Sequence, residues 1–245
     1  MSIWAHDWLA PDWPARPRVR VCITTRTGGV SSAPYDTLNL GDHVEDDPAA
    51  VAKNRLRLVS QLGCRPAWLR QVHGVSVAQA DPNVVAEADA SWTHQPGVAC
   101  AVMTADCLPA LFCDRAGTRV AAAHAGWRGL AAGVLEATLD SLACAPENVL
   151  VWLGPAIGPQ AFEVGGEVRD AFMAQHPQAA DAFVPSVNTG RYMADIYHLA
   201  RIRLAARGVT AVFGGGLCTY NDARFYSFRR APRTGRFASL IWLAN

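Results

Sequence analysis

Short apolar runs alternate with amphipathic segments along the whole chain, and this alternation limits the folds that it can adopt. Runs rich in Val, Ile, Ala and Thr, which are typical of β-strands, occupy residues 18–25, 98–104, 118–123, 149–153, 209–213 and 237–243. Helical patterns cover 48–62, 127–143 and the segment between Asp195 and Gly208. Because the two kinds of segment are mixed rather than segregated, the pattern predicts an α/β or α+β fold.

The clearest predicted helices begin and end at residues that suit helix ends. Asp47 can cap the helix over 48–62, Pro48 suits its first position, and Gly63 can end it. The helix predicted over 127–143 has an apolar face made of Leu130, Val134, Thr138 and Leu142. The Gly/Pro-rich segment 155–168 also carries apolar side chains, so we expect an ordered loop that leads into a helix, and a single domain over residues 1–245.

Composition excludes several classes of function. The net charge is +1, so the chain has no basic surplus to attract nucleic acid or an anionic membrane. No run reaches the ~18 apolar residues needed to span a bilayer, and the N-terminus has no signal-peptide pattern. The chain has 7 cysteines and no C-x-x-C pair, which favours reduced thiols in a cytoplasmic protein. The sequence leaves the oligomeric state open.

Three reactive side chains stand where strand-like runs meet loops. His73 lies in "WLRQVHG", Cys107 in "AVMTADCLPALF" and His124 in "VAAAHAGWRG". Loops at strand ends are where α/β folds place functional groups. Two imidazoles and one thiolate suit a catalytic zinc, which takes three protein ligands, and they also suit copper. The same residues could instead form a Cys–His hydrolase, or could be ordinary core residues, because the spacing matches no metal motif.

Several arginines could bind an anion. Arg26 lies in a turn with two glycines, Arg128 follows His124 at a predicted helix start, and Arg229 lies in "RFYSFRR". A guanidinium fork suits phosphate or carboxylate, and a helix start adds backbone N–H groups. Among the remaining thiols, Cys218 is expected to be structural.

Taken together, the motifs resemble one family. "RTGGVSSAPYDTLNLGDHVEDDPAAVAKNR", "RQVHG", "TADCLPALF", "AAAHAGWRGL", "GPAIGPQAFEVGGEV" and "CTYNDARFYSFRR" followed by "TGR" occur in this order over about residues 18–245. This order is similar to that of the bacterial YfiH-type family, whose members are also called multicopper polyphenol oxidoreductases, laccase-domain proteins and purine nucleoside phosphorylases. Asn221 departs from the pattern, since relatives often carry cysteine there.

The resemblance implies a layered α/β/β/α domain with mixed sheets, related to the cysteine hydrolase fold of cytotoxic necrotizing factor. It implies that His73, Cys107 and His124 are catalytic and hold a metal, with zinc as the first choice and copper as the alternative. We expect the substrate-binding residues to be Arg26, Asn39, Gln71, Arg128 and Arg229.

The implied activities are phosphorolysis of adenosine, inosine, guanosine and methylthioadenosine, and deamination of adenosine. The implied partners are therefore a nucleoside and phosphate, with Asp106 or Glu163 as the proton shuttle. Two other readings stay open: a Cys107-based amidohydrolase that edits a peptidoglycan precursor, and a copper-dependent polyphenol oxidase.

The stretch "AAAHAGWRG" can be interpreted in the same terms. Residues 121–123 are all Ala and would let a strand pack closely up to His124. Gly126 would permit a sharp turn, and the ring of Trp127 would either wall the pocket or, as we favour, anchor the helix that follows.

Overall fold

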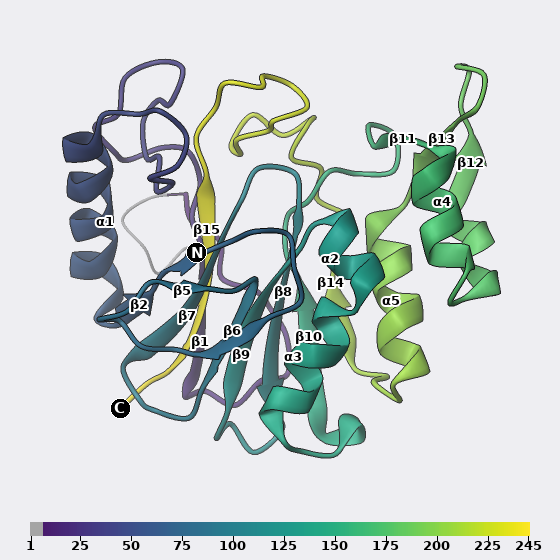
Figure 1. Cartoon of the computed structure of the whole chain (residues 1–245). Coiled ribbons are helices and arrows are strands. Elements are labelled where there is room, and N and C mark those ends of the chain that lie inside the picture. The colour runs from purple at the N-terminus through teal and green to yellow at the C-terminus, as the bar shows by residue number, and fades with distance from the viewer. Residues whose placement is uncertain (1–6) are drawn as a thin grey trace.

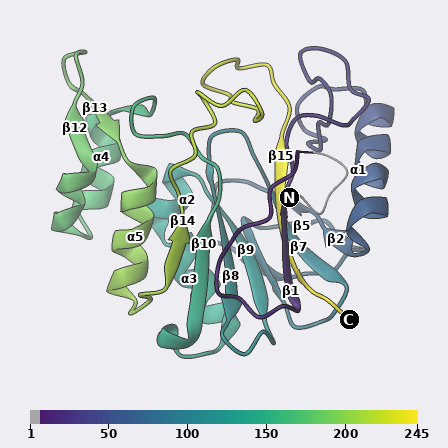
Figure 2. The same ribbon diagram turned by 180° about the vertical axis from the view of Figure 1, so that it is seen from behind.

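The structure is a computed structural model, and it describes residues 7–245. Two large sheets lie at its centre (Figures 1 and 2). The four-stranded sheet has the order β1 (Val19–Ile23), β15 (Phe237–Leu243), β7 (Val98–Thr104) and β2 (Arg65–Ala67). The six-stranded sheet has the order β14 (Val212–Gly214), β10 (Val149–Leu153), β8 (Leu108–Asp114), β9 (Val120–Ala125), β6 (Ala90–Thr93) and β4 (Val77–Gln79).

Both sheets are mixed. β1, β15 and β7 are antiparallel, while β2 is parallel to β7. In the larger sheet β10, β8, β9 and β6 are antiparallel, and β14 and β4 add parallel edges. The smaller sheets are β11 (Glu163–Gly165), β13 (Arg191–Ala194) and β12 (Phe183–Pro185), and the pair β3 (Leu69–Arg70) and β5 (Ala86–Glu87).

Helices cover the outer faces of the two large sheets. The helices are α1 (Pro48–Leu62), α2 (Trp127–Ala132), α3 (Val134–Leu142), α4 (Gly166–Met173) and α5 (Ile196–Ala206), with 3-10 turns at Pro146–Asn148 and Pro177–Ala182. In Figure 1, α1 lies on one side of the sheets, and α2, α3 and α5 lie on the other side. The order of layers is therefore α/β/β/α, as the resemblance implied.

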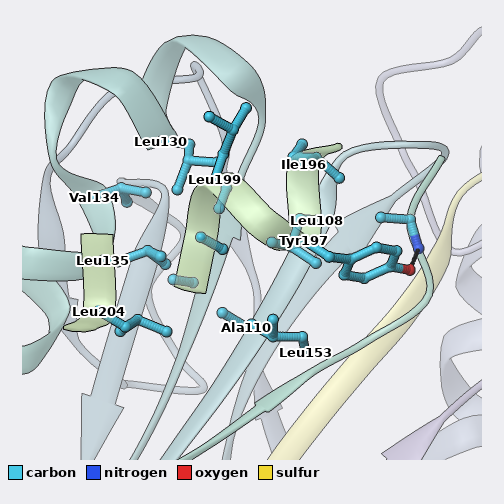
Figure 3. Packing of buried hydrophobic residues seen from close by; sticks show 14 of the residues in the cluster. Leu108, Ala110, Leu130, Val134, Leu135, Leu153, Ile196, Tyr197, Leu199 and Leu204 are labelled. Atoms are coloured by element: carbon cyan, nitrogen blue, oxygen red, sulfur yellow. Dashed lines mark hydrogen bonds between the residues drawn. The ribbon is translucent and has the colours of Figure 1, made fainter. Parts of the chain in front are cut away.

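The buried apolar residues fill the spaces between these layers. One cluster packs α1 against the four-stranded sheet and includes Leu58 and Leu240. A second lies between the sheets and includes Leu111 and Ile241. The third joins the six-stranded sheet to the helices on its outer face (Figure 3), and its members include Leu108, Ala110, Leu130, Val134, Leu135, Leu153, Ile196 and Leu199. Because β8 and β9 have covered faces, all of their residues are buried, which explains their continuous apolar sequence.

The expected elements are largely confirmed. Each of the six predicted strand runs overlaps a strand, and the helix over 48–62 has the predicted Asp47 cap and a left-handed Gly63 at its end. The motif "AVMTADCLPALF" around Cys107 spans two strands, β7 and β8, with a turn between them at Asp106. The segment 155–168 leads into α4, as expected.

The single continuous helix predicted over 127–143 was wrong. The pattern over 127–143 forms two helices, α2 and α3, which meet at Gly133. Gly133 has φ 110°, a left-handed conformation that breaks the hydrogen-bonding ladder and that glycine adopts without steric cost. The apolar spacing survives this break, so periodicity alone did not reveal it. No helix within residues 7–245 is long and apolar enough to cross a membrane.

Candidate metal and nucleoside site

The structure brings His73, Cys107 and His124 together, as their sequence contexts predicted. Their ligand atoms all lie within 4.8 Å of one another, and Cys107 Sγ is 3.8 Å from His73 Nε2. His73 follows β3, Cys107 lies in the turn between β7 and β8, and His124 is on β9. Antiparallel pairing of β8 with β9 sets Pro109 opposite His124, so two of the three side chains meet at one end of the same sheet.

A buried carboxylate that the sequence analysis missed, Asp89, organises this cluster. Its Oδ1 accepts hydrogen bonds from the His73 backbone N–H (2.9 Å) and from His124 Nδ1 (2.8 Å). Its Oδ2 accepts from the N–H groups of Val72 (3.1 Å) and Gly74 (2.6 Å). The Asp89 side chain has no solvent exposure. In the sequence it is one acidic residue before a short strand, and only the pairing of β6 with β9 places it beside His124.

The chain adopts constrained backbone conformations at two positions in the cluster. His73 has φ 62° and Asp106 has φ 96°, both in the left-handed region that non-glycine residues rarely adopt. Asp106 is held there because Oδ1 accepts from Thr219 Oγ1 (2.6 Å) and Oδ2 accepts from the Arg229 N–H (2.7 Å). The loops that carry His73 and Cys107 are therefore fixed by side-chain contacts.

Gly126 is needed for a reason other than the expected turn. Its φ of −60° and ψ of 155° are values that any residue can adopt. A Cβ atom at this position would instead lie 2.8 Å from His73 Cδ2 and 3.0 Å from Cys107 Sγ. Glycine is thus required because two of the clustered side chains approach its backbone closely. Trp127 packs against the outer apolar cluster, as expected for a helix anchor.

The electrostatics of the cluster favour a charged thiolate–imidazolium pair in the metal-free protein. Burial opposes charge on Cys107, but the charge of His124 and hydrogen bonds from both histidines outweigh it and lower the pKa of the thiol to about 6. Burial also opposes charge on His124, whereas Cys107 and Asp89 raise its pKa to about 9. Burial acts against ionisation of Asp89, yet its hydrogen bonds from His124 and Gly74 hold its pKa below the usual value.

The three side chains open into a cavity of about 410 Å³. Apolar groups form part of its wall, including Phe162, Phe228, Ile157 and Met103. The polar groups around it, besides the cluster itself, are His43, Gln71, Thr104, Asp106, Arg229 and Arg236. A concave site with apolar walls and a few convergent polar groups is the usual form of a small-molecule site.

Two of the five expected substrate-binding residues line this cavity. Gln71 lies on its wall, but its amide is already paired with the backbone of Met103 through two bonds of 2.8 Å. Arg229 is exposed to the cavity while its guanidinium donates to the carbonyls of Ala161 (3.3 Å) and Glu163 (3.1 Å).

The other three expected substrate-binding residues do not line it. Arg26 is engaged in an ion pair with Asp36 (2.9 Å) and stacks over Tyr226. Arg128 is exposed, lies over the ring of Trp127 at 4.5 Å from its centroid, and is not part of the cavity wall. Asn39 is fully buried and binds neighbouring backbone groups.

The cavity also has two basic residues that the sequence analysis missed, Arg236 and His43. Arg236 was visible only as the last residue of the "TGR" motif, and His43 as a histidine in a loop, so neither could be placed without the tertiary structure. The two candidate proton shuttles differ in position. Asp106 lines the cavity, whereas Glu163 lies outside it and accepts hydrogen bonds from Ser186 and Asn188, which lower its pKa.

The remaining sequence predictions concern Cys218 and Asn221. The sulfur of Cys218 accepts a hydrogen bond from the Gly158 N–H (3.2 Å) and does not line the cavity, consistent with a structural role. Asn221 is exposed and also lies off the cavity wall.

The donor set fits a zinc or copper ion. A tetrahedral zinc with bonds of about 2.0–2.3 Å needs ligand atoms roughly 3.3–3.6 Å apart. The 3.8 Å between Cys107 Sγ and His73 Nε2 is close to this range, and all three ligand atoms lie within 4.8 Å of one another. Asp89 engages Nδ1 of His124 and leaves Nε2 free to bind metal, an arrangement frequent at zinc sites. His73, Cys107 and His124 would therefore be the ligands.

Comparison with known proteins places the chain in a family. The family model described as multi-copper polyphenol oxidoreductase laccase matches residues 20–244. A Pseudomonas aeruginosa protein named purine nucleoside phosphorylase is 73% identical over 241 residues, covering 98% of this chain and 100% of the relative. The Escherichia coli K12 protein named purine nucleoside phosphorylase YfiH is 57% identical, covering 96% and 98%.

Solved structures agree with this placement. A Neisseria meningitidis protein aligns with a TM-score of 0.95 at 51% identity, covering 98% of this chain and 100% of that one. YlmD from Geobacillus stearothermophilus aligns with a TM-score of 0.90 at 30% identity, covering 98% and 97%. The chain therefore belongs to the YfiH-type family of multi-copper polyphenol oxidoreductase laccase proteins.

Proposed function

We propose that this chain is a zinc-dependent purine nucleoside phosphorylase that also deaminates adenosine. The observation that carries the proposal is the joint presence, in one cavity, of the His73–Cys107–His124 cluster, cationic side chains and two aromatic rings. The names of the relatives at 73% and 57% identity support the phosphorylase assignment. The expected substrates are adenosine, inosine, guanosine and methylthioadenosine.

The cavity walls suit the parts of a nucleoside. Phe162 and Phe228 offer apolar surfaces against which a flat purine ring can pack. Arg229 and Arg236 offer positive charge for phosphate and for the charge that develops as the glycosidic bond breaks. A volume of about 410 Å³ falls within the range of small-molecule sites.

In the proposed phosphorolysis, an oxygen of hydrogen phosphate attacks C1′ of the ribose. The bond between C1′ and N9 breaks, its electron pair stays on the purine, and the proton of hydrogen phosphate ends on the base. The products are the free base and ribose 1-phosphate, so atoms and charge balance. The protein's contribution is to hold phosphate and nucleoside in line and to exclude bulk water.

Asp106 would hold the turn that carries Cys107 in place rather than act as a free proton shuttle. Both of its carboxylate oxygens already accept hydrogen bonds from Thr219 and Arg229, so its main effect is to hold the Cys107 turn. When bound, zinc would supply Lewis-acid stabilisation of negative charge at the cluster. In deamination, water would enter the same cavity in place of phosphate. Adenosine and water would be converted to inosine and ammonia.

A cysteine amidohydrolase is the second candidate, and a specific observation favours it. The pKa of Cys107 is lowered to about 6 beside two histidines, as in thiol nucleophiles. A polyphenol oxidase has less support, because true multi-copper oxidases need several metal sites, whereas residues 7–245 contain one cluster of this type.

We also propose a cytoplasmic location and a single domain over residues 1–245. All seven cysteines are free, which suits a reducing compartment. The proposed partners are nucleoside and phosphate, with no nucleic acid or membrane.

The deciding experiment measures metal content and activity on one preparation. We expect about one zinc per chain and release of hypoxanthine from inosine that depends on phosphate and forms an equal amount of ribose 1-phosphate. Chelation should abolish this activity and zinc should restore it better than copper. Absence of phosphate-dependent base release would refute the phosphorylase, and peptidoglycan-precursor hydrolysis that survives chelation but not thiol alkylation would establish the amidohydrolase.

A further inference from the structure

Three basic side chains line the cavity beside the metal-ligand cluster, and they differ in which of their nitrogens are engaged. His43, Arg229 and Arg236 are the three. The two terminal nitrogens of Arg229 each donate to a backbone carbonyl of the 161–163 segment. Both terminal nitrogens of its guanidinium therefore help to hold that segment.

Arg236 retains free donors. Only one of its terminal nitrogens, Nη1, is engaged, with the carbonyls of Thr234 and Gly235 at 3.0 Å each. Within residues 7–245, no partner is found for its Nε or Nη2, and no carboxylate lies within ion-pair distance of it. A half-buried guanidinium without an anionic partner retains an edge that can pair with two oxygens of one anion.

The backbone around Arg236 is built to hold this side chain in place. The buried Asn39 accepts the Arg236 N–H at its Oδ1 (2.8 Å), and the same oxygen accepts the Gly41 N–H (3.0 Å). The Leu40 N–H donates to the Arg236 carbonyl (3.1 Å). A Cβ on Gly41 would lie 2.8 Å from Arg236 Cγ, so glycine is what admits the arginine stem. Asn39, expected to contact substrate, thus acts by positioning Arg236.

Arg236 also lies between the main cavity and a second, neighbouring hollow. It and His43 line both the main cavity and a neighbouring hollow of about 350 Å³ that is bounded by Arg233 and Thr234. The opposite charges of Cys107 and Asp106 act on Arg236, which places its positive charge near the metal-ligand cluster. Burial and the charge of Arg236 lower the pKa of His43, so His43 is a neutral hydrogen-bond donor at this junction.

From this arrangement we propose that Arg236 and His43 form the phosphate subsite of the cavity. The inference rests on the proposed phosphorylase activity and states where phosphate, the second substrate of that reaction, binds. The ligand is a tetrahedral phosphate oxyanion, bound by the free edge of the Arg236 guanidinium and by one N–H of His43. It is inorganic phosphate rather than the phosphate group of a nucleotide, because the nucleoside must fill the main cavity beside the cluster. Arg128, which the sequence favoured for this role, is outside the cavity wall.

The test compares Arg236→Lys with Arg128→Lys, since both keep positive charge and lose the guanidinium fork. Inosine phosphorolysis is measured over a phosphate series, and inorganic phosphate is titrated calorimetrically into the zinc-loaded protein without nucleoside. Arg236→Lys should raise the KM for phosphate by about tenfold or more, the range expected for a lost charged hydrogen bond, with the KM for inosine nearly unchanged. Arg128→Lys should leave both values at wild type. Melting curves check that the variants are folded.

Two further experiments test the proposal with a second variant and with a second phosphate compound. His43→Asn alters an exposed side chain and should raise the KM for phosphate by a smaller factor, about threefold. Inosine 5′-monophosphate is titrated alongside inorganic phosphate. If Arg236→Lys weakens the nucleotide and spares inorganic phosphate, the subsite belongs to a nucleotide and our assignment is wrong.

The outcomes separate this inference from the proposed function. Wild-type phosphorolysis with an unchanged phosphate KM in Arg236→Lys overturns the subsite and leaves the activity standing. Phosphate binding that depends on Arg236, in a protein that does not cleave nucleosides, overturns the activity and supports the subsite. If the KM for phosphate rises in Arg128→Lys alone, phosphate binds at the start of helix α2 and our assignment to Arg236 is wrong.

Discussion

Replacing Asp89 with Asn tests whether one buried carboxylate holds the metal-ligand cluster together. The side chain accepts four hydrogen bonds, two on each oxygen, from Val72, His73, Gly74 and His124. An Asn of the same shape keeps one acceptor oxygen and turns an NH2 group toward the other two donors. Each buried donor left without an acceptor costs about 1–3 kcal/mol, so Asp89→Asn should lower the free energy of unfolding by about 2–6 kcal/mol.

Zinc affinity is the readout that distinguishes a positioning role from a purely structural one. Loss of the negative charge and of two of the four acceptor contacts weakens the hold on the His124 ring and the His73 loop, so zinc affinity should fall about 10–100-fold, as it does for other residues that orient metal ligands. Urea unfolding of the chelated protein gives the stability change, and competition with a chelating dye gives the zinc affinity. Because the folded-state pKa of Asp89 is lowered, its stabilisation is present above the unfolded value of about 3.9 and is lost on acidification.

Asp114 provides a matched control. It is also a buried carboxylate, and it accepts from the backbone and hydroxyl of Thr118 and from the Arg119 N–H in a distant turn. Asp114→Asn should lower stability without changing zinc affinity. If folded Asp89→Asn binds zinc as tightly as wild type, the positioning argument is refuted.

Three other predictions address the cluster. Cys107→Ala should abolish activity and zinc binding, whereas Cys218→Ala should keep most of both; equal losses in the two folded variants would contradict our ranking of the thiols. Gly126→Ala should weaken zinc binding, because its Cβ would lie 2.8 Å from a carbon of His73, while Gly166→Ala, where nothing lies within 4 Å, should not; metal titration of both variants checks this. In chelated protein, alkylation of Cys107 by iodoacetamide should reach half its maximal rate near pH 6 and stay high through neutral pH, since the thiolate persists above its lowered pKa of about 6; a midpoint above pH 8 would show that the histidines do not stabilise the thiolate.

Local residue patterns alone predict much of this protein. Apolar runs and caps locate the main strands and the ends of α1, because these depend on side-chain alternation and on single residues such as Asp47 and Gly63. The same patterns show that His73, Cys107 and His124 end apolar runs, and the ordered motifs point to their common family. Their convergence was therefore expected before the structure, whereas the choice between metal binding and a Cys–His hydrolase was left open by their spacing.

Only the tertiary structure decides which other residues reach the site. Asp89 and Arg236 enter through strand pairing and a loop held by Asn39, contacts between segments far apart in sequence that leave no periodic signal. Arg128 follows His124 closely in sequence, yet its guanidinium lies over Trp127 and does not line the cavity. Proximity along the chain is thus a poor guide to whether a side chain reaches a site, because strand β9 gives way to helix α2 between His124 and Arg128, and side-chain directions follow different rules in strands and helices.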